Sequence, residues 1–191
     1  MKAIAFNGSA RTEGNTNLLL KRVMGELEAE GIETEIISLA GKNLRGCIGC
    51  YRCIEQQNQR CAVASDEINS YLEKMLAADA IILGSPTYFA DVTANMKALI
   101  ERAGMVALAN GGMFARKAGA AVVAVRRGGA IHVFNSLNHF FFISQMIVPG
   151  SSYWNDGIGR NIGEVQSDEE GMRTMTNLGI NMAWLLKKIN S

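Results

Sequence analysis

The sequence predicts an α/β fold in which helices cover both faces of a doubly wound parallel sheet. Short apolar runs and amphipathic helical patterns alternate five times along the 191 residues. The runs are rich in Ile, Val and Ala on both faces, which is typical of parallel strands covered by helices. Neither a linker nor an internal repeat divides the chain. We therefore expect residues 1–191 to form a single domain with right-handed crossovers.

The strand and helix candidates alternate along the chain. Five apolar runs predict strands at residues 2–7, 33–39, 80–84, 118–125 and 146–148. Five helical patterns predict helices at residues 16–30, 66–77, 94–103, 130–143 and 167–189. Ser65 is the expected cap of the second helix, and residues 167–170 form a capping-box pattern before the last one. The segments 41–64 and 150–166 are long for loops, which indicates a functional role.

The charge balance excludes some classes of partner. The chain has 19 Lys and Arg residues against 18 Asp and Glu, so it offers no strong field for nucleic acid or for an anionic membrane. Its apolar runs are too short or too interrupted to span a bilayer, and no cleavage-site pattern of a secretory signal is visible. We therefore expect a cytoplasmic location, where cysteines serve as thiols, metal ligands or redox groups more often than as structural disulfides.

The loop after the first strand has the composition of a phosphate cradle. Residues 7–17 are rich in hydroxyl and amide side chains and lead into a helix, whose first N–H groups attract an anion. The loop matches neither the dinucleotide fingerprint nor the Walker loop, which favours one terminal phosphate over a pyrophosphate. The alternative is an ordinary loop in which Thr16 caps the helix. The candidate phosphate ligands are Ser9, Arg11, Asn15, Thr16 and Asn17.

The loop after the third predicted strand lies at the same edge of the sheet, because the carboxyl ends of parallel strands meet there. Pro86 ends the strand, since it cannot donate to a strand ladder. Tyr88 and Phe89 offer flat aromatic surfaces, and the backbone N–H groups from Thr87 to Phe89 can bond the polar rim of a planar cofactor ring. The alternative is that both aromatic side chains pack under the next helix.

The loop after the fourth predicted strand carries two arginines and two glycines. Gly128 and Gly129 permit a close approach of the backbone to a ligand. Arg126 and Arg127 can stabilise negative charge on a reduced ring or attract the phosphate of a second substrate. The alternative is that both arginines are solvated, although a cation at a helix start is mildly unfavourable.

All four cysteines lie in one predicted loop. They follow the spacing Cys47-x2-Cys50-x2-Cys53-x7-Cys61. Four closely spaced thiolates suit a [4Fe–4S] cluster, whereas zinc is more often bound by two separated pairs. The last gap is long, and no proline follows Cys61 as it does in bacterial ferredoxins. Three alternatives therefore remain: a cluster, reduced or redox-active thiols, and zinc.

Taken in order, the three loops resemble those of the NADPH-dependent FMN reductase family, whose fold is flavodoxin-like. Residues 8–16 resemble the FMN-phosphate loop, residues 85–89 the isoalloxazine loop and residues 127–129 the third loop. The resemblance implies a three-layer sandwich with strand order 2-1-3-4-5 and FMN as the cofactor. It implies that FMN is held by Ser9, Arg11, Asn15, Thr16, Asn17, Pro86, Thr87, Tyr88, Phe89, Arg127, Gly128 and Gly129. No catalytic side chain is assigned, because the flavin carries the hydride chemistry.

The cysteine run resembles the iron–sulfur flavoprotein branch of the same family, whose cysteines lie in this inserted loop, here residues 41–64. That resemblance implies a [4Fe–4S] cluster on Cys47, Cys50, Cys53 and Cys61, and a homodimer or homotetramer. The leading hypothesis is an oxidoreductase that passes electrons from NAD(P)H to a flavin, a quinone or another small acceptor. The second is an electron carrier with ferredoxin-like partners, and the third is a non-enzymatic, flavin-binding regulatory protein.

Overall fold

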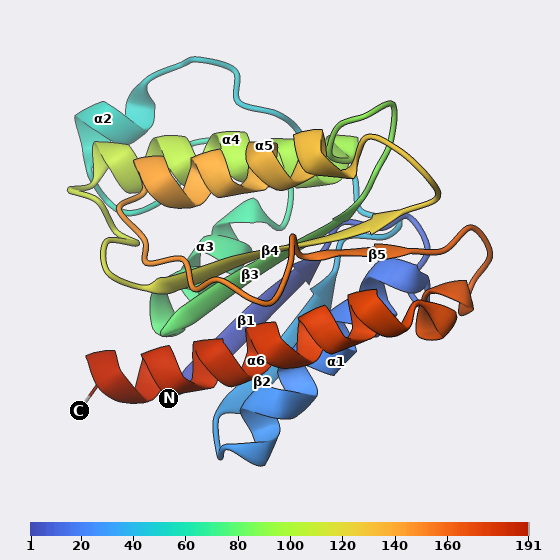
Figure 1. The fold of residues 1–191 in the computed structure, drawn as a ribbon. Coiled ribbons are helices and arrows are strands. Elements are labelled where there is room, and N and C mark those ends of the chain that lie inside the picture. Colours follow the sequence, from blue (N-terminus) through green and yellow to red (C-terminus); the bar gives the residue numbers. More distant parts are fainter. Residues whose placement is uncertain (191) are drawn as a thin grey trace.

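The centre of the molecule is a five-stranded parallel sheet with the strand order β2-β1-β3-β4-β5 (Figure 1). The computed structural model describes residues 1–190. The strands are β1 (Lys2–Asn7), β2 (Glu33–Ser38), β3 (Ala80–Pro86), β4 (Ala118–Val125) and β5 (Asp156–Ile158). The predicted fold class and strand order are confirmed.

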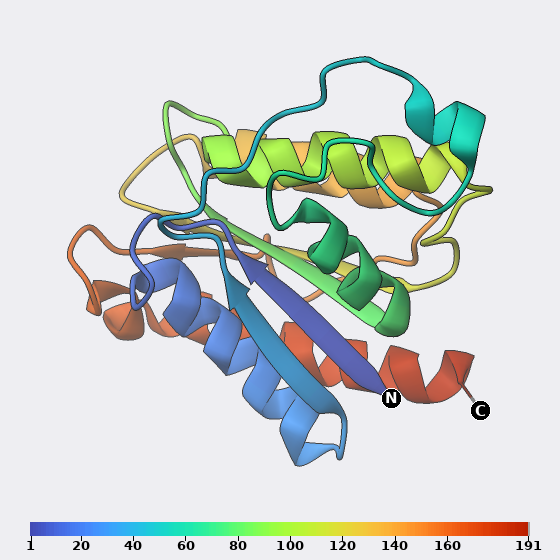
Figure 2. The ribbon, with the colours of Figure 1, turned by 180° about the vertical axis from the view of Figure 1, so that it is seen from behind.

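Six α-helices and one 3-10 helix connect and cover the strands in residues 1–190. They are α1 (Asn15–Ala29), α2 (Arg52–Gln56), α3 (Ile68–Ala77), α4 (Ala94–Ala109), α5 (Ala130–Ile143), η1 (Glu164–Ser167) and α6 (Glu169–Ile189). Helices α1 and α6 lie on one face of the sheet, and α3, α4 and α5 lie on the other, as the two opposite views show (Figures 1 and 2). The result is a three-layer sandwich. Within residues 1–190, no helix is both long and apolar enough to cross a membrane.

The two faces of the sheet bury separate cores because neighbouring strand residues point to opposite sides. Ile4 and Phe6 of β1 pack under α3 and α4, whereas Ala3 and Ala5 pack against α1 and α6. Strand β4 is buried along its whole length. The residues that follow the central strands are therefore held on a rigid edge, which is where the candidate ligand loops lie.

The predicted fifth strand, at residues 146–148, is wrong. Ile147 forms only an isolated bridge with Ala118, and the fifth strand is β5, which pairs with Val123–Val125. The prediction relied on the apolar run at residues 146–148. An edge strand, however, is defined by its hydrogen-bonded pairing with a neighbouring strand and not by an apolar sequence. Strand β5 has only three residues, Asp-Gly-Ile, which is too short for a hydrophobic pattern that would predict a strand.

Several helix ends also differ from the prediction. Helix α4 continues to Ala109 instead of ending at residue 103. Ser65 is not a cap, because α3 begins at Ile68 and Asp66 Oδ1 accepts its N–H at 3.3 Å. Asp168 caps α6 by accepting from Gly171 N at 3.0 Å, so the serine of the expected capping box takes no such role.

Candidate functional site

A cavity of about 190 Å³ lies at the carboxyl ends of the central strands. It is formed by the first two predicted loops, the start of the third, and a fourth loop after β5. Its lining residues are Ser9, Arg11, Gly14, Asn15, Thr16, Pro86, Thr87, Tyr88, Ala124, Val125, Arg126, Gly159 and Arg160. The edge of a doubly wound sheet where strand order reverses is the usual ligand position. We refer to this space as the strand-end cavity.

The first loop is shaped by its own polar side chains. Asn7 Oδ1 accepts from Ser9 N at 3.0 Å, and Ser9 Oγ accepts from Arg11 N at 3.1 Å. Gly8 lies tightly against β3, where its N–H donates to Gly84 O at 2.7 Å. A Cβ at Gly8 would approach that oxygen to 3.0 Å, so only glycine fits without displacement. These contacts fix a tight turn directly before α1.

Helix α1 begins without a side-chain cap, since its N-cap residue is Gly14. The alternative that Thr16 caps the helix is therefore wrong: Thr16 is inside the first turn and is 1% exposed. Within residues 1–190, its Oγ1 and that of Thr87 are buried and have no hydrogen-bond partner. Both residues line the strand-end cavity. Two unpaired hydroxyls beside an uncapped helix start are an arrangement that a ligand with several acceptor atoms would satisfy.

The side chains of Asn15 and Asn17 are already committed to contacts within the protein. Asn15 Nδ2 donates to Asn161 O at 2.9 Å, and its Oδ1 accepts from Gly163 N at 2.9 Å. Asn17 is buried, and its Nδ2 donates to Glu13 Oε2 at 3.1 Å. Both amides thus stabilise the loops around the cavity. Asn15 also brings the loop after β5 to the first loop, a contact between distant segments that local pattern could not reveal.

The second loop projects its aromatic side chains outward. Tyr88 and Asp91 bond to each other through both backbone groups, at 2.9 and 3.0 Å. Phe89 and Ala90 between them have left-handed φ angles of 48° and 61°. Tyr88 is 47% exposed and Phe89 is fully exposed, so the alternative that both pack under the next helix is wrong. Tyr88 lines the strand-end cavity, and Phe89 lies on an exposed, strained turn beside it.

The third loop lies only partly at the strand-end cavity. Arg126 lines the strand-end cavity, whereas Arg127 and Gly128 lie outside that lining. Gly129 has a φ angle of 91°, and a Cβ there would meet Thr87 Cγ2 at 3.1 Å. Glycine at this position thus lets the second and third loops touch. Sequence pattern missed Arg160, which the fourth loop places at the cavity; an arginine between two glycines, at 159 and 163, was its only local signal.

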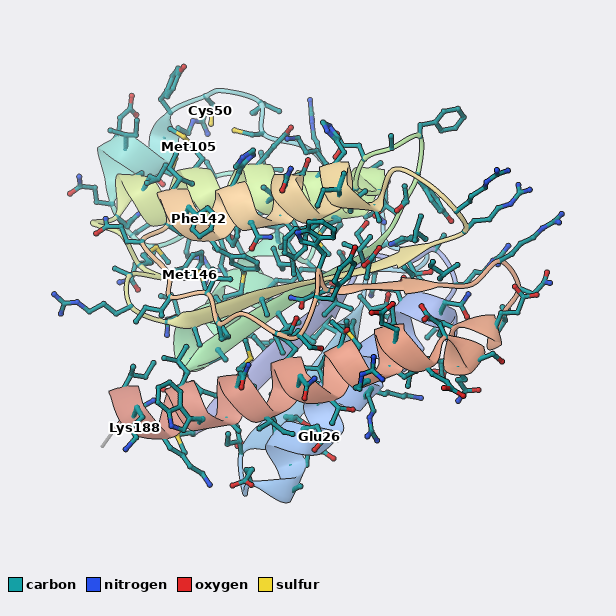
Figure 3. All side chains as sticks on the ribbon, viewed as in Figure 1. Glu26, Cys50, Met105, Phe142, Met146 and Lys188 are labelled. Atoms are coloured by element: carbon teal, nitrogen blue, oxygen red, sulfur yellow. The ribbon has the colours of Figure 1, made fainter. Side chains whose placement is uncertain are left out.

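All four cysteines line a second cavity, of about 150 Å³, between the inserted loop and α4. We call it the cysteine cavity. Met105 and Val106 of α4 form its floor, and Figure 3 shows Cys50 and Met105 beside each other above that helix. Cys47 and Cys50 are exposed, Cys61 is half-buried and Cys53 is buried, and all four are free thiols. The inserted loop also contains α2, which the sequence did not predict.

Within residues 1–190, no three Cys, His, Asp or Glu side chains are arranged to hold a single metal ion. A [4Fe–4S] cluster makes a different demand, because each of its four irons takes one thiolate and the thiolates stand farther apart. Four thiols around one apolar cavity, much larger than an ion, match that demand better than they match zinc. Burial raises the pKa of Cys53, and the nearby Cys61 and Cys47 raise it further.

Helix α4 connects the two cavities. Its N-cap, Thr93, contacts the first loop by donating from its hydroxyl to Gly8 O at 2.7 Å, and accepts from Met96 N. Met105, at the cysteine cavity, lies eleven residues after Ala94. At about 1.5 Å per residue this corresponds to roughly 16 Å along the helix axis. The two candidate sites therefore lie at opposite ends of one rigid element.

The fold and the strand-end cavity define a flavodoxin-like protein with a ligand site at the carboxyl ends of its strands. More particularly, residues 1–160 match the family model of NADPH-dependent FMN reductase, and the chain belongs to that family. An iron–sulfur flavoprotein of Methanocaldococcus jannaschii is 40% identical, with 99% of each chain covered.

Solved structures share the fold at low sequence identity. RosB with a bound 8-demethyl-8-formylriboflavin-5'-phosphate intermediate has a TM-score of 0.73 and 19% identity, covering 100% of this chain and 80% of that one. A WrbA-like flavodoxin from Agrobacterium tumefaciens has a TM-score of 0.68 and 14% identity, covering 98% of this chain and 97% of that one. The flavodoxin-like fold predicted from the loops is thereby confirmed.

Proposed function

We propose that the protein uses FMN to take hydride from NAD(P)H and to pass electrons to a small acceptor, such as a free flavin or a quinone. The observation that carries this proposal is the pair of buried, unpartnered hydroxyls of Thr16 and Thr87 among the described residues lining the strand-end cavity. Leaving a buried hydroxyl unpaired costs free energy, and a ligand with acceptor atoms removes that cost. FMN fits this donor set, since it carries a phosphate at one end and a polar ring at the other.

The phosphate end of FMN suits the first loop. Ser9, Arg11 and Thr16 offer a hydroxyl, a cation and a second hydroxyl around the uncapped start of α1. Asn15 and Asn17 act here by holding the loops in place. The neighbouring cation and the helix dipole both favour a dianion at this point.

The ring end of FMN suits the second and third loops. Pro86, Thr87 and Tyr88 form one side of the cavity, and Arg126 stands on another. In this proposal Phe89, Arg127, Gly128 and Gly129 form its outer rim. Bound FMN supplies the hydride-accepting chemistry. The chain itself orients the ring, limits access of water to it, and places the Arg126 cation where negative charge develops on reduction.

A second candidate function is electron transfer through a [4Fe–4S] cluster held by Cys47, Cys50, Cys53 and Cys61. The observation that favours it is that all four thiols line one cavity, although eleven residues of other types lie between the first and last of them. The name of the 40% identical relative, an iron–sulfur flavoprotein, supports the same proposal. A ferredoxin-like protein would then be the natural partner, because it also exchanges single electrons.

The test is an anaerobic preparation analysed for FMN, iron and acid-labile sulfide, with visible spectra taken before and after addition of NADPH. Bleaching of the flavin bands by NADPH without iron supports the oxidoreductase. About four irons and four sulfides per chain, with slow bleaching by NADPH and fast bleaching by a reduced ferredoxin, support the carrier. Bound FMN that neither donor reduces contradicts both and leaves the regulatory protein.

A further inference from the structure

Arg102 of α4 is the largest fully buried side chain in the described part of the protein. Its side chain is 0% exposed, and it lies beneath the inserted loop, at the cysteine cavity. Arginine is almost never buried unless its charge is paired, because removing an ion from water is costly. Its position therefore requires a specific set of partners, and those partners belong to the segment that carries the cysteines.

The Arg102 guanidinium joins both arms of the inserted loop. On the arm before the cysteines, Nη1 donates to Arg45 O at 3.2 Å. On the arm after them, Nη2 donates to Val63 O, and Nη1 also bonds to the Asp66 carboxylate. The third nitrogen, Nε, donates to Cys61 Sγ at 3.2 Å. One planar group thus closes the loop and contacts a cysteine sulfur at the same time.

The charge of Arg102 is only partly balanced by Asp66. The Asp66 side chain is 3% exposed; burial by itself raises its pKa, but the hydrogen bond from Arg102 and those from backbone N–H groups outweigh burial and lower it. Asp66 thus carries a negative charge and bonds Nη1, whereas Cys61 Sγ bonds a different nitrogen, Nε. The Cys61 sulfur accepts directly from Nε of the positively charged guanidinium. This contact favours negative charge on the sulfur.

We propose that Arg102 is the positioning residue of the cysteine cavity: it holds Cys61 in place and raises the reduction potential of the cluster that the four cysteines bind. This inference rests on the cluster proposed above. Adding one electron makes a cluster more negative, and a cation beside one of its sulfur ligands stabilises the reduced form more than the oxidised form. Hydrogen bonds to the sulfur ligands act in the same direction.

A purely structural role of Arg102 predicts a different pattern of reduction potentials among the variants. Replacing Arg102 would loosen the loop, and removing its carboxylate partner would loosen the loop in the same way. An electrostatic role instead predicts shifts of opposite sign. Arg102→Leu removes a positive charge near Cys61 and lowers the potential. Asp66→Asn removes the compensating negative charge and raises it.

The experiment is an anaerobic titration with dithionite, which supplies the electrons one at a time to the cluster, followed by EPR on the flavoprotein carrying both groups. The samples are the wild type, Arg102→Leu, Arg102→Lys and Asp66→Asn, with iron, sulfide and FMN contents measured on each. Arg45→Met is the matched control, because it removes an exposed cation of the same loop and leaves the backbone carbonyl that Arg102 uses.

We expect Arg102→Leu to lower the potential or, where the cluster is lost, to lose iron while retaining FMN. Arg102→Lys keeps the charge and is expected to stay closer to the wild type, Asp66→Asn to shift upward, and Arg45→Met to be unchanged. Iron in the wild type with equal potentials in all variants, or a potential in Asp66→Asn that does not rise, overturns this inference alone. A wild type without iron overturns the proposed cluster and this inference together.

Discussion

Asn15 and Asn161 are 146 positions apart in the chain, and a hydrogen bond of 2.9 Å joins the side chain of the first to the carbonyl of the second. Asn15 Oδ1 also accepts from Gly163 N at 2.9 Å. The Asn15 amide therefore both donates to and accepts from the backbone of the loop after β5. Gly159 of that loop leaves no room for a Cβ, which would meet Asn15 Nδ2 at 2.8 Å. Arg160 is thereby carried to the strand-end cavity.

Asn15→Ala is expected to weaken FMN binding through the loop contacts that its amide makes. It removes two hydrogen bonds that hold the loop of Arg160, each worth about 1 kcal/mol, so the dissociation constant should rise by up to about 30-fold. Asn15→Asp keeps the acceptor for Gly163 N, but it adds a negative charge beside the proposed phosphate site and should weaken FMN binding further. Quenching of flavin fluorescence in titrations of the apoprotein measures both. Wild-type affinity in Asn15→Ala would show that the loop is held without this residue.

Thr16→Val is expected to lower the affinity for FMN while leaving the apoprotein at least as stable as the wild type. A hydrogen bond to a charged phosphate contributes about 1.5–3 kcal/mol, which corresponds to about a 10- to 150-fold change in affinity. In the free protein the Thr16 hydroxyl is buried without a partner among residues 1–190, so its removal costs nothing there.

The same variant should bind riboflavin, which lacks the phosphate, as the wild type does. Thr12→Val is the matched control, because Thr12 is an exposed residue of the same loop that lies outside the cavity lining. Equal losses for FMN and riboflavin in Thr16→Val would place its hydroxyl away from the phosphate.

Substitutions of Arg126 and Arg127 are expected to affect different ligands: the first FMN and the second NAD(P)H. Arg126 lines the strand-end cavity, so Arg126→Ala should weaken FMN binding by about 10-fold, as expected for loss of one charged hydrogen bond. Arg127 lies outside the lining, so Arg127→Ala should keep FMN affinity. If Arg127 recruits the phosphate of NAD(P)H, its variant raises the KM for that donor. Steady-state turnover with saturating FMN tests this, and an unchanged KM rules out a role for Arg127.

Asp156→Asn is expected to stabilise the protein at neutral pH. Burial raises the pKa of Asp156 above its ordinary value of 3.8, and the charges of Asp168 and Glu170 raise it further. Because the folded-state pKa is the higher one, stability falls as the pH rises from 3.8 through the raised pKa, and the loss persists at pH 7. The variant should therefore melt at a higher temperature than the wild type at pH 7, and the difference should shrink toward pH 3.8.

Glu169→Gln provides the comparison for Asp156→Asn. It removes a negative charge from the first turn of α6, where the helix dipole favours such a charge, so it should not stabilise the protein. Thermal unfolding followed by circular dichroism at several pH values measures all three proteins. A stability gain in Asp156→Asn that is independent of pH would contradict the titration argument.

The sequence predicted the central fold because its signals are local and repeated. Strands β1, β3 and β4 are buried apolar runs, and α1 and α6 have clear helical periodicity. Strand β5 was missed because a three-residue edge strand is defined by its pairing with β4 and not by its composition. The predicted helix ended at residue 103, one residue before Gly104, whereas in the fold α4 continues to Ala109 and Gly104 faces Phe140.

The candidate site was predicted in part for the same reason. Ser9, Arg11, Thr16 and Thr87 belong to loops whose composition already indicated a ligand, and they line one cavity. The internal role of the Asn15 amide, and the arrival of Arg160, depend on a contact across most of the chain. In the sequence Arg102 is one charged residue of a predicted helix, and nothing local indicates its buried ion pair with Asp66. That pair depends on how the inserted loop folds onto α4.

The inserted loop is attached to the rest of the protein in an unusual way. In the described part of the chain, the backbone–backbone hydrogen bonds of residues 45–63 stay within α2 and its ends. The loop is held from outside by side chains, such as Arg102, Asn69 and Glu101. It can therefore open without breaking any strand ladder, at a lower free energy than global unfolding. In the proposed function, folding and cluster insertion are therefore separable events: the sheet can be complete, with flavin bound, before iron and sulfide reach the thiols.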